Sequence, residues 1–264
     1  MNKPLIPAQR RERIQELLAI RNIVRIADLS ALLGASEATI RRDLEWLENE
    51  GILERTHGGA VQSQRALFEP EYLQRAQRHT EEKRKIGAAA AAQIEDGDIV
   101  FINSGTTTTQ MVRHIRNNAR VTVITNNLTA ALEVGQHGFE LIMLGGDFQP
   151  KSNSVAGRFA IENLSKVYAS KAFISVDGIS IKHGFTVPSN AEAEIICLML
   201  ERTHGPITIV ADHSKWGVVS NFEIARIDQI HRLITDEGMS IHARAALAAR
   251  SIEVFIADEH PAKS

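Results

Sequence analysis

Six short apolar runs after residue 97 constrain the fold of the chain most strongly, because segments with helical character separate them. The runs occupy residues 99–102, 121–125, 140–144, 172–176, 207–211 and 232–235, and residues 253–257 form a further candidate. Strands that are apolar throughout, with helices between them, suit a parallel sheet that is covered on both faces. The sequence therefore predicts an α/β domain with a Rossmann-like parallel sheet.

Polar residues follow most of these runs at the points where the strands should end. Such sheets bind small ligands outside the carboxyl ends of their strands. The loop at Ser104 and Gly105 opens a helix, and the free N–H groups of a helix start can hold an anion. Lys215 adds a positive charge, whereas Asp177 and Glu192 can accept hydrogen bonds from hydroxyl groups.

Together these residues predict a pocket for a small phosphorylated polyhydroxy compound. We expect the effector to contact Ser104, Gly105, Thr106, Thr107, Thr108, Asn126, Gly145, Gly146, Asp177, Glu192 and Lys215. Each residue alone could be an ordinary helix cap, loop residue or surface charge. Their shared position after strand ends favours the pocket.

Residues 26–60 predict a different structure: a helix, a tight turn and a second helix. Ile40, Leu44 and Leu47 recur on one face of the second helix and should pack inward. Ala38 and Arg42 point away from that face, and arginine there can reach guanine edges or phosphates in a DNA groove. The glycines that follow predict a β-hairpin, or wing. An ordinary helical pair with a polar outer face is the alternative.

The residues expected to contact DNA lie on the outer arc of the second helix and in the wing. They are Ser36, Glu37, Ala38, Thr39, Arg41, Arg42, Arg55, His57 and Gly58. The charge of residues 1–61 is nearly balanced, so one such domain should hold DNA weakly and need a second copy.

The segment SEATIRRDLEWLENEGILERTHGGA resembles the N-terminal winged helix-turn-helix of the DeoR family of bacterial transcriptional regulators. The second half is similar to the sensor domain of that family, which has a fold like that of ribose-5-phosphate isomerase. The similar segments are NSGTTTTQM, TNNL, LGG, VDGI, NAEAEI and ADHSKWG. Two sites depart from the pattern. Arg25 and Ile26 stand where the family usually has Ser or Thr, and Ile196 and Cys197 stand where a Lys is common.

The resemblance implies a DNA-binding regulator, namely a repressor of a carbohydrate catabolic operon that responds to a phosphorylated sugar or related metabolite. It also implies a homo-oligomer, either dimer or tetramer, on operator DNA. The alternative is an aldose-ketose isomerase in which Asp177, Glu192 and Lys215 act as base, acid and phosphate anchor. Such an enzyme has no use for residues 26–60, so we expect no catalytic residues and no cofactor.

Length and composition fit two globular domains. The chain has 264 residues, 44% of them hydrophobic and 23% charged, with a formal net charge of −2. We expect a DNA-binding domain at residues 1–61, a linker at 62–80 and an α/β effector-binding and oligomerisation domain at 81–264. Ten scattered histidines and one cysteine predict no metal site. The lack of an apolar signal core or membrane-length run predicts a cytoplasmic protein with no membrane partner.

Overall fold

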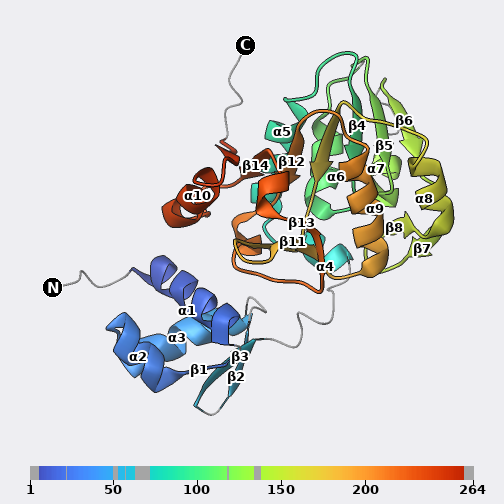
Figure 1. Ribbon diagram of the computed structural model, residues 1–264. Helices are drawn as coiled ribbons and strands as arrows, with labels where there is room; N and C mark the ends of the chain where they lie inside the picture. Colours follow the sequence, from blue (N-terminus) through green and yellow to red (C-terminus); the bar gives the residue numbers. More distant parts are fainter. Residues whose placement is uncertain are drawn as a thin grey trace. The chain divides into compact units, whose positions relative to one another are not determined.

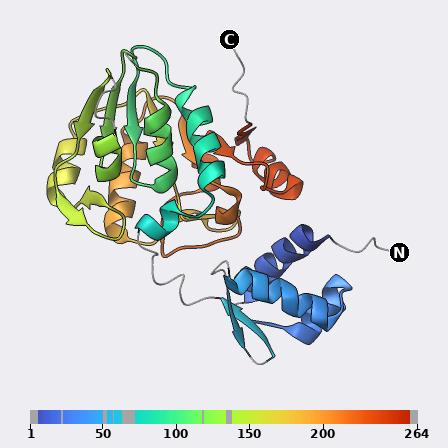
Figure 2. The same ribbon diagram turned by 180° about the vertical axis from the view of Figure 1, so that it is seen from behind.

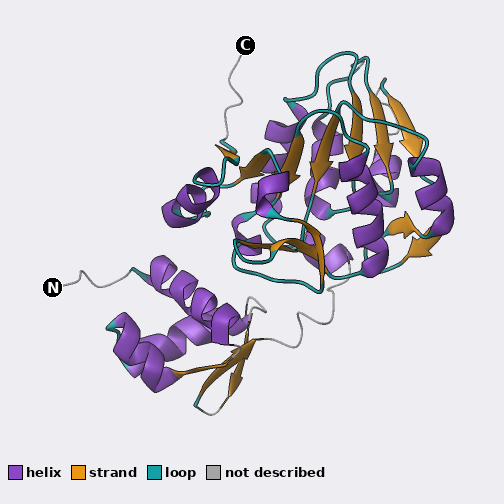
Figure 3. Ribbon diagram, in the orientation of Figure 1, coloured by secondary structure: helices purple, strands orange, loops and turns teal. Residues whose placement is uncertain are grey.

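The computed structural model describes residues 6–21, 23–49, 53–56, 58–62, 72–117, 119–133 and 138–258 (Figures 1 and 3). The chain forms two compact units, which divide between Glu69 and Pro70. Within these described ranges, no helix combines the length and the apolar character needed to cross a membrane.

The first unit is a three-helix domain with a small antiparallel sheet. Its elements are α1 (Pro7–Arg21), β1 (Ile23–Arg25), α2 (Ile26–Leu33), α3 (Glu37–Asn49), β2 (Leu53–Thr56) and β3 (Gly59–Gln62), with strand order β1-β3-β2. Ile40, Leu44 and Leu47 are fully buried against Ile14 of α1 and Leu29 of α2. The helix-turn-helix and its wing therefore form as the periodicity predicts. Strand β1, which completes the small sheet, was not predicted.

Two glycines allow this unit to close. Gly34 ends α2 in the left-handed conformation, at φ 63°, and so turns the chain toward α3. Gly59 lies in β3 against β1, where a Cβ atom would stand 1.9 Å from the carbonyl oxygen of Val24. The wing can pack on β1 only because residue 59 has no side chain.

A buried ion-pair cluster joins α1 to α3. The carboxylate of Asp43, which is 2% exposed, binds the guanidinium of Arg10 and accepts a 3.0 Å hydrogen bond from Nε of Arg11. Arg11 also lies over the ring of Trp46, 4.2 Å from its centroid. Arg10 and Arg11 thus hold α1 against α3 through Asp43.

The second unit contains the predicted parallel sheet of seven strands. The strands are β4 (Ile99–Ile102), β5 (Thr122–Thr125), β6 (Glu140–Met143), β9 (Lys171–Ile174), β12 (Ile207–Val210), β14 (Arg232–Thr235) and β15 (Glu253–Ile256). Their order is β15-β14-β12-β9-β4-β5-β6, and every neighbouring pair is parallel. The predicted α/β fold class is confirmed.

Helices cover both faces of this sheet (Figures 1 and 2). One core contains Val100 and Ile102 of β4 and packs under α5 (Thr80–Ala91), α6 (Thr106–His114) and α7 (Leu128–Glu133). The other contains Phe101 and packs under α8 (Arg158–Leu164), α9 (Asn190–Glu201) and α10 (Ile241–Ala248). Because successive strand residues face opposite sides, each strand has to be apolar throughout.

Short antiparallel strands extend the second unit beyond the main sheet. They are β7 (Asp147–Gln149) paired with β8 (Ser154–Ala156), and β10 (Gly178–Ser180), β11 (Gly184–Val187) and β13 (Phe222–Ala225) in the order β10-β11-β13. A 3₁₀ turn, η2 (His213–Lys215), follows β12, and a second, η3 (Ile227–Gln229), follows β13. These short strands were not predicted, because the spacing of their polar residues does not indicate strands.

Residues 72–80, which the sequence placed in a linker, begin the second unit instead. Helix α4 (Tyr72–Ala76) packs on α6, where the hydroxyl of Tyr72 lies 2.8 Å from Oγ1 of Thr109. The N–H group of Tyr72 also donates to the carbonyl of Lys151 at 3.0 Å. Tyr72 is the only buried residue of α4, so the segment is too polar and too short for its sequence to show the fold.

We predict that Asp43→Ala destabilises the first unit by about 3–5 kcal/mol, because it leaves the buried charge of Arg10 without its carboxylate. Urea unfolding followed by the fluorescence of Trp46, in a Trp216→Phe background, measures this unit. Glu45→Ala, which removes an exposed carboxylate from the same helix, is the control and should change little. A free energy of unfolding for Asp43→Ala that matches the control would contradict the prediction.

Candidate DNA-binding surface and ligand pocket

The outer face of α3 carries the residues that the sequence assigned to DNA. Ser36, Glu37, Ala38, Arg41 and Arg42 are exposed, and Thr39 is half-buried. The Oγ atom of Ser36 accepts a hydrogen bond from the backbone N–H of Thr39 at 3.2 Å, so Ser36 caps the start of the helix. This arrangement leaves the first turns of α3 open, as insertion into a major groove requires.

The arginines of this surface differ in their partners. Arg41 lies 3.5 Å from the carboxylate of Glu37, and Nε of Arg55 donates to Glu48 at 2.8 Å. Arg42 makes no ion pair with any residue that the structure describes. Because exposed ion pairs contribute little, Arg41 and Arg55 can exchange their carboxylates for phosphates at low cost. We therefore expect Arg42 to contact DNA without giving up an ion pair with any described residue.

The wing contains the remaining two predicted DNA contacts. Gly58 is exposed, and its carbonyl accepts a 2.9 Å hydrogen bond from the N–H of Ile26, which ties the wing to the start of α2. Arg25 precedes that helix and makes no capping hydrogen bond through its side chain, as its departure from the family pattern predicts. His57 lies outside the described residues.

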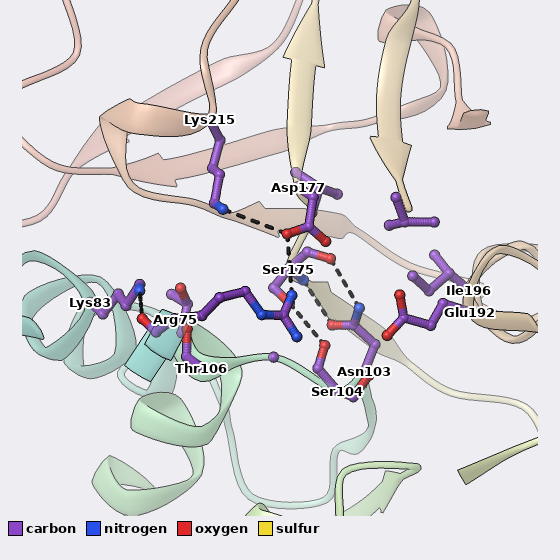
Figure 4. Close-up of a pocket in the computed structure, with 14 residues that line it drawn as sticks. Arg75, Lys83, Asn103, Ser104, Thr106, Ser175, Asp177, Glu192, Ile196 and Lys215 are labelled. Atoms are coloured by element: carbon purple, nitrogen blue, oxygen red, sulfur yellow. Dashed lines mark hydrogen bonds and ion pairs between the residues drawn. The ribbon is translucent and has the colours of Figure 1, made fainter. Parts of the chain in front are cut away.

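The second unit has a pocket at the carboxyl ends of β4 and β9 (Figure 4). These strands are neighbours, but the chain continues from β4 to β5 on one side and from β9 to β12 on the other. The pocket therefore occupies the point where the strand order reverses, which is where open α/β sheets bind ligands. About 430 Å³ of space, partly open to solvent, lies between its walls.

Fourteen residues line this pocket, and seven of them are residues that the sequence assigned to the effector. The lining consists of Arg75, Lys83, Asn103, Ser104, Gly105, Thr106, Thr107, Ser175, Val176, Asp177, Val187, Glu192, Ile196 and Lys215. The structure thus brings together Ser104, Gly105, Thr106, Thr107, Asp177, Glu192 and Lys215, which come from four separate parts of the sequence.

The loop between β4 and α6 is fixed by contacts with the end of β9. Asn103 accepts from the N–H of Ser175 at 2.8 Å and donates to its carbonyl at 2.9 Å. Gly105 precedes α6, and a Cβ atom there would lie 2.0 Å from Oγ of Ser175. The close approach explains the glycine and brings the start of α6, with its free N–H groups, to the pocket wall.

Arg75 and Lys215 both reach Asp177, as Figure 4 shows. Nη1 of Arg75 lies 3.2 Å and Nζ of Lys215 lies 3.6 Å from the same oxygen, Oδ1. Burial alone would raise the pKa of Asp177, but the positive charges of Lys215 and Arg75 hold it below its usual value. Asp177 is therefore a carboxylate that orients two cations.

Lys83 adds a third cation to the same wall. Its Nζ atom donates to the carbonyls of Arg75 and Arg78 at 2.6 and 2.7 Å, which fixes the end of α4. Burial lowers the pKa of Lys83 to about 8, and the charges of Lys215 and Arg75 act in the same direction, against that of Asp212. The ammonium group of Lys83 should therefore lose its proton at a pH near 8.

The opposite wall combines one acid with apolar side chains. Glu192, at the start of α9, is 6% exposed. Val176, Val187 and Ile196 complete this side of the pocket. Ile196 occupies one of the two positions where the sequence departs from the family pattern, so the departure falls inside the pocket. The pocket is consequently cationic on one side and mostly apolar on the other.

Four residues that the sequence assigned to the effector lie elsewhere. Thr108 donates its hydroxyl to the carbonyl of Gly105 at 3.0 Å and is fully buried. Asn126 accepts from the N–H of Ser104 at 2.9 Å and donates to Val155, so it holds the loop in place from behind. Gly145 and Gly146 are exposed outside the pocket lining. They follow β6, which lies at the edge of the sheet, three strands away from β9.

Sequence reasoning missed Arg75, Lys83 and Ser175 as well as the lining role of Asn103. Ser175 directly follows β9 and Asn103 directly follows β4, so the rule of strand ends could have found both. Arg75 and Lys83 precede every strand of the sheet and reach the pocket only because α4 and α5 pack against α6. Their sequence surroundings contain no motif that indicates this.

A winged helix-turn-helix and an α/β unit with a cationic pocket, in one chain, define a DNA-binding regulator that responds to a small molecule. The pattern of the DeoR-like helix-turn-helix domain matches residues 10–66, and that of the DeoR C terminal sensor domain matches residues 78–237. The chain belongs to the DeoR family of helix-turn-helix transcriptional regulators. Members of this family are transcription regulators and not enzymes.

Known proteins similar to this chain include whole-length relatives. The HTH-type transcriptional regulator YulB of Bacillus subtilis (strain 168) is 34% identical over 95% of this chain and 96% of its own length. The putative aga operon transcriptional repressor of Escherichia coli O157:H7 is 33% identical over 96% and 94%. Among solved structures, ribose 5-phosphate isomerase A of Methanocaldococcus jannaschii aligns at 16% identity over 52% and 54%, with a TM-score of 0.38.

We predict that the pocket binds a divalent anion more weakly as the pH rises through about 8, where Lys83 loses its charge. Sulfate is a suitable probe because its own charge does not change between pH 7 and 9. Calorimetric titration should show a loss of affinity of about tenfold over this range, the size of one charge-assisted hydrogen bond. The charged groups that act on Lys83 are Arg75, Lys215, Asp177 and Asp212.

Two variants test the origin of this pH dependence. Lys83→Met should bind sulfate weakly with little change between pH 7 and 9. Lys85→Met removes a charge from the same helix outside the pocket and should keep the full dependence. If the affinity of Lys83→Met still falls tenfold, another group is responsible.

Proposed function

We propose that this regulator represses a carbohydrate catabolic operon, and that a phosphorylated sugar or related metabolite bound in the second unit controls its binding to the operator. The convergence of Arg75, Lys83 and Lys215 with the start of α6 is the observation that carries the proposal. Three cations and a helix start suit a phosphate group. Asp177, beside these cations, and Glu192, on the opposite wall, can accept hydrogen bonds from sugar hydroxyls.

The lining of the pocket supports a small metabolite. Val176, Val187 and Ile196 can pack against the carbon skeleton of a sugar while the phosphate faces the cations. The similarity to the Escherichia coli relative, which is named as a putative operon repressor, supports the repressor role.

The geometry argues against the isomerase alternative. A general base needs a pKa close to the working pH so that it can take a proton and give it back. The pKa of Asp177 is instead held low by Lys215 and Arg75, which also occupy its oxygen Oδ1. Such a carboxylate can bind a ligand but is a poor proton acceptor.

Arg75 provides a physical route from the pocket to the DNA-binding unit. It belongs to α4, the first described helix after the residues that join the two units. A phosphate that draws the guanidinium away from Asp177 therefore acts on the segment that leads to the first unit. The ligand can change operator affinity only by favouring one arrangement over another.

We also propose that the protein acts as a homo-oligomer, at least a dimer. Asp43 pairs with Arg10 and Arg11, and Glu37 and Glu48 pair with Arg41 and Arg55, so carboxylates neutralise much of the positive charge that phosphates could use. Two units on two half-sites would supply the affinity and specificity that a single unit lacks. The second unit is the expected site of assembly.

The proposal is tested by operator binding in the presence of candidate metabolites. Purified protein is bound to the DNA upstream of its own gene and challenged with a panel of pentose and hexose phosphates, with the corresponding free sugars and inorganic phosphate as controls. At least one sugar phosphate should shift the binding curve at a concentration where its controls do not. If no phosphorylated compound shifts sequence-specific binding, the effector proposal is wrong.

We predict that Arg42→Ala lowers specific operator affinity by about 10- to 100-fold, the discrimination expected for one bidentate contact to a base. Gel-shift titrations against operator and unrelated DNA measure the ratio, while calorimetry checks that binding of the active metabolite is unchanged. Arg250→Ala, in the second unit, removes an exposed arginine and should not alter either value. Normal footprinting by Arg42→Ala would show that the groove-facing arc of α3 is assigned wrongly.

We predict that Lys215→Ala leaves operator binding intact but raises the metabolite concentration needed for half of the response by at least tenfold, because a charge-assisted bond to phosphate is lost. Gel shifts at increasing metabolite concentration measure this value. Lys166→Ala, which removes an exposed lysine after α8, serves as the control. An unchanged response of Lys215→Ala would exclude Lys215 from the phosphate site.

A further inference from the structure

Three possible metal ligands from two distant parts of the sequence meet beside the pocket. His79 precedes α5, while Asp212 and His213 follow β12, and one ligand atom from each lies within 4.8 Å of the other two. We propose that His79, Asp212 and His213 bind a divalent transition metal ion, with Zn²⁺ as the preferred ion. Because the cluster comes from tertiary packing, the spacing of histidines in the sequence predicted no metal site.

Asp212 provides the strongest observation for this site. Its side chain is 1% exposed, and its Oδ1 atom accepts hydrogen bonds from the backbone N–H of Ser214, at 3.0 Å, and from the hydroxyl of the same residue. Its Oδ2 atom is buried and has no hydrogen-bond partner among the described residues. Leaving a buried carboxylate oxygen unsatisfied is costly, and coordination to a metal ion would satisfy it.

His213 is held in the orientation that a metal ligand needs. Its Nδ1 atom lies 2.7 Å from Oδ2 of Asp236, a carboxylate that is 5% exposed. The N–H group of Gly238 donates to the same Oδ2 atom at 2.9 Å, and a Cβ atom on Gly238 would lie 2.5 Å from Nδ1 of His213. Metal-binding histidines usually give their second ring nitrogen to a carboxylate in this way, which leaves Nε2 for the metal.

His79 completes the set from a strained position. It adopts the left-handed conformation at φ 50°, which is uncommon for a residue other than glycine and is found at functional sites. Its ring lies 4.9 Å from that of His213, at an angle of 80°. Tetrahedral zinc ligands stand about 3.4 Å apart, so small side-chain rotations would bring the three atoms into place.

Neighbouring lysines do not occupy the carboxylate. The charges of Lys83 and Lys215 act on Asp212, but Nζ of Lys83 donates to two backbone carbonyls, and Nζ of Lys215 lies 3.6 Å from Asp177. Asp212 and Asp236 supply two negative charges to balance a divalent ion. Two imidazoles with one carboxylate favour zinc and similar ions over magnesium or calcium, and leave a fourth position for water.

A metal ion at this place would join the first helices of the second unit to the main sheet. His79 immediately precedes α5, and the η2 turn that holds His213 also holds Lys215 of the pocket. The ion would therefore fix both the start of α5 and the turn that presents Lys215. This consequence does not depend on the identity of the effector or of the operator.

The test measures metal binding by the untagged full chain, without DNA or metabolite. Protein is stripped with chelator, incubated with Zn²⁺, desalted and analysed for metal content, and Co²⁺ is titrated in parallel to observe its visible absorption bands. The expected result is one zinc ion per chain and a cobalt spectrum of four- or five-coordinate geometry. A wild-type chain that retains no zinc, or no defined cobalt bands, would overturn the proposal.

Variants separate this site from adventitious binding. His79→Asn tolerates the left-handed conformation and should weaken zinc binding more than tenfold. Asp236→Asn, which removes the carboxylate partner of His213 and one negative charge near the ion, should weaken it 10- to 100-fold. His242→Ala removes an exposed histidine of α10 and should retain full binding. Circular dichroism without metal confirms that each variant is folded. Folded His79→Asn protein with wild-type zinc affinity would exclude the site.

Discussion

The double hydrogen bond between Asn103 and the backbone of Ser175 is the contact on which the rest of the pocket depends. Beyond the last pair of residues in β4 and β9, the two chains must separate to reach strands on opposite sides of the sheet. The amide of Asn103 replaces the missing sheet hydrogen bonds at this point. It keeps the two strand ends together while Gly105 lets α6 begin directly beside Ser175, so the helix start and Asp177 share one cavity.

The predictable part of this structure follows from rules that act along the chain. The apolar runs gave the strands of the sheet, and the residues after β4, β9 and β12 supplied Ser104, Asp177 and Lys215. The rule that ligand contacts follow strand ends failed at Gly145 and Gly146, because it does not distinguish the end of a central strand from that of an edge strand. Strand order decides that difference, and strand order is a property of tertiary packing.

The residues that could not be predicted reach their places through contacts between distant segments. Arg75 enters the pocket because Tyr72 anchors α4 to Thr109 and Lys151, and Lys83 follows because its ammonium binds the last carbonyls of that region. A similar limit applies to the first unit, where periodicity placed Ile40 and Leu44 inside but did not reveal the buried position of Asp43. Its partners are in another helix.

The pairing of Arg75 and Lys215 with one carboxylate sets a condition on any anionic ligand. Asp177 already neutralises part of the cationic wall, so a phosphate has to compete with it and gains less than three unpaired cations would give. The binding free energy lost in this competition is recovered if a sugar hydroxyl donates a hydrogen bond to Asp177 while the phosphate pairs with Arg75 and Lys215. A free phosphate lacks that hydroxyl, and a free sugar lacks the charge. The paired arrangement would thus favour ligands that contain both groups, which is the discrimination that the proposed sensing of phosphorylated metabolites requires.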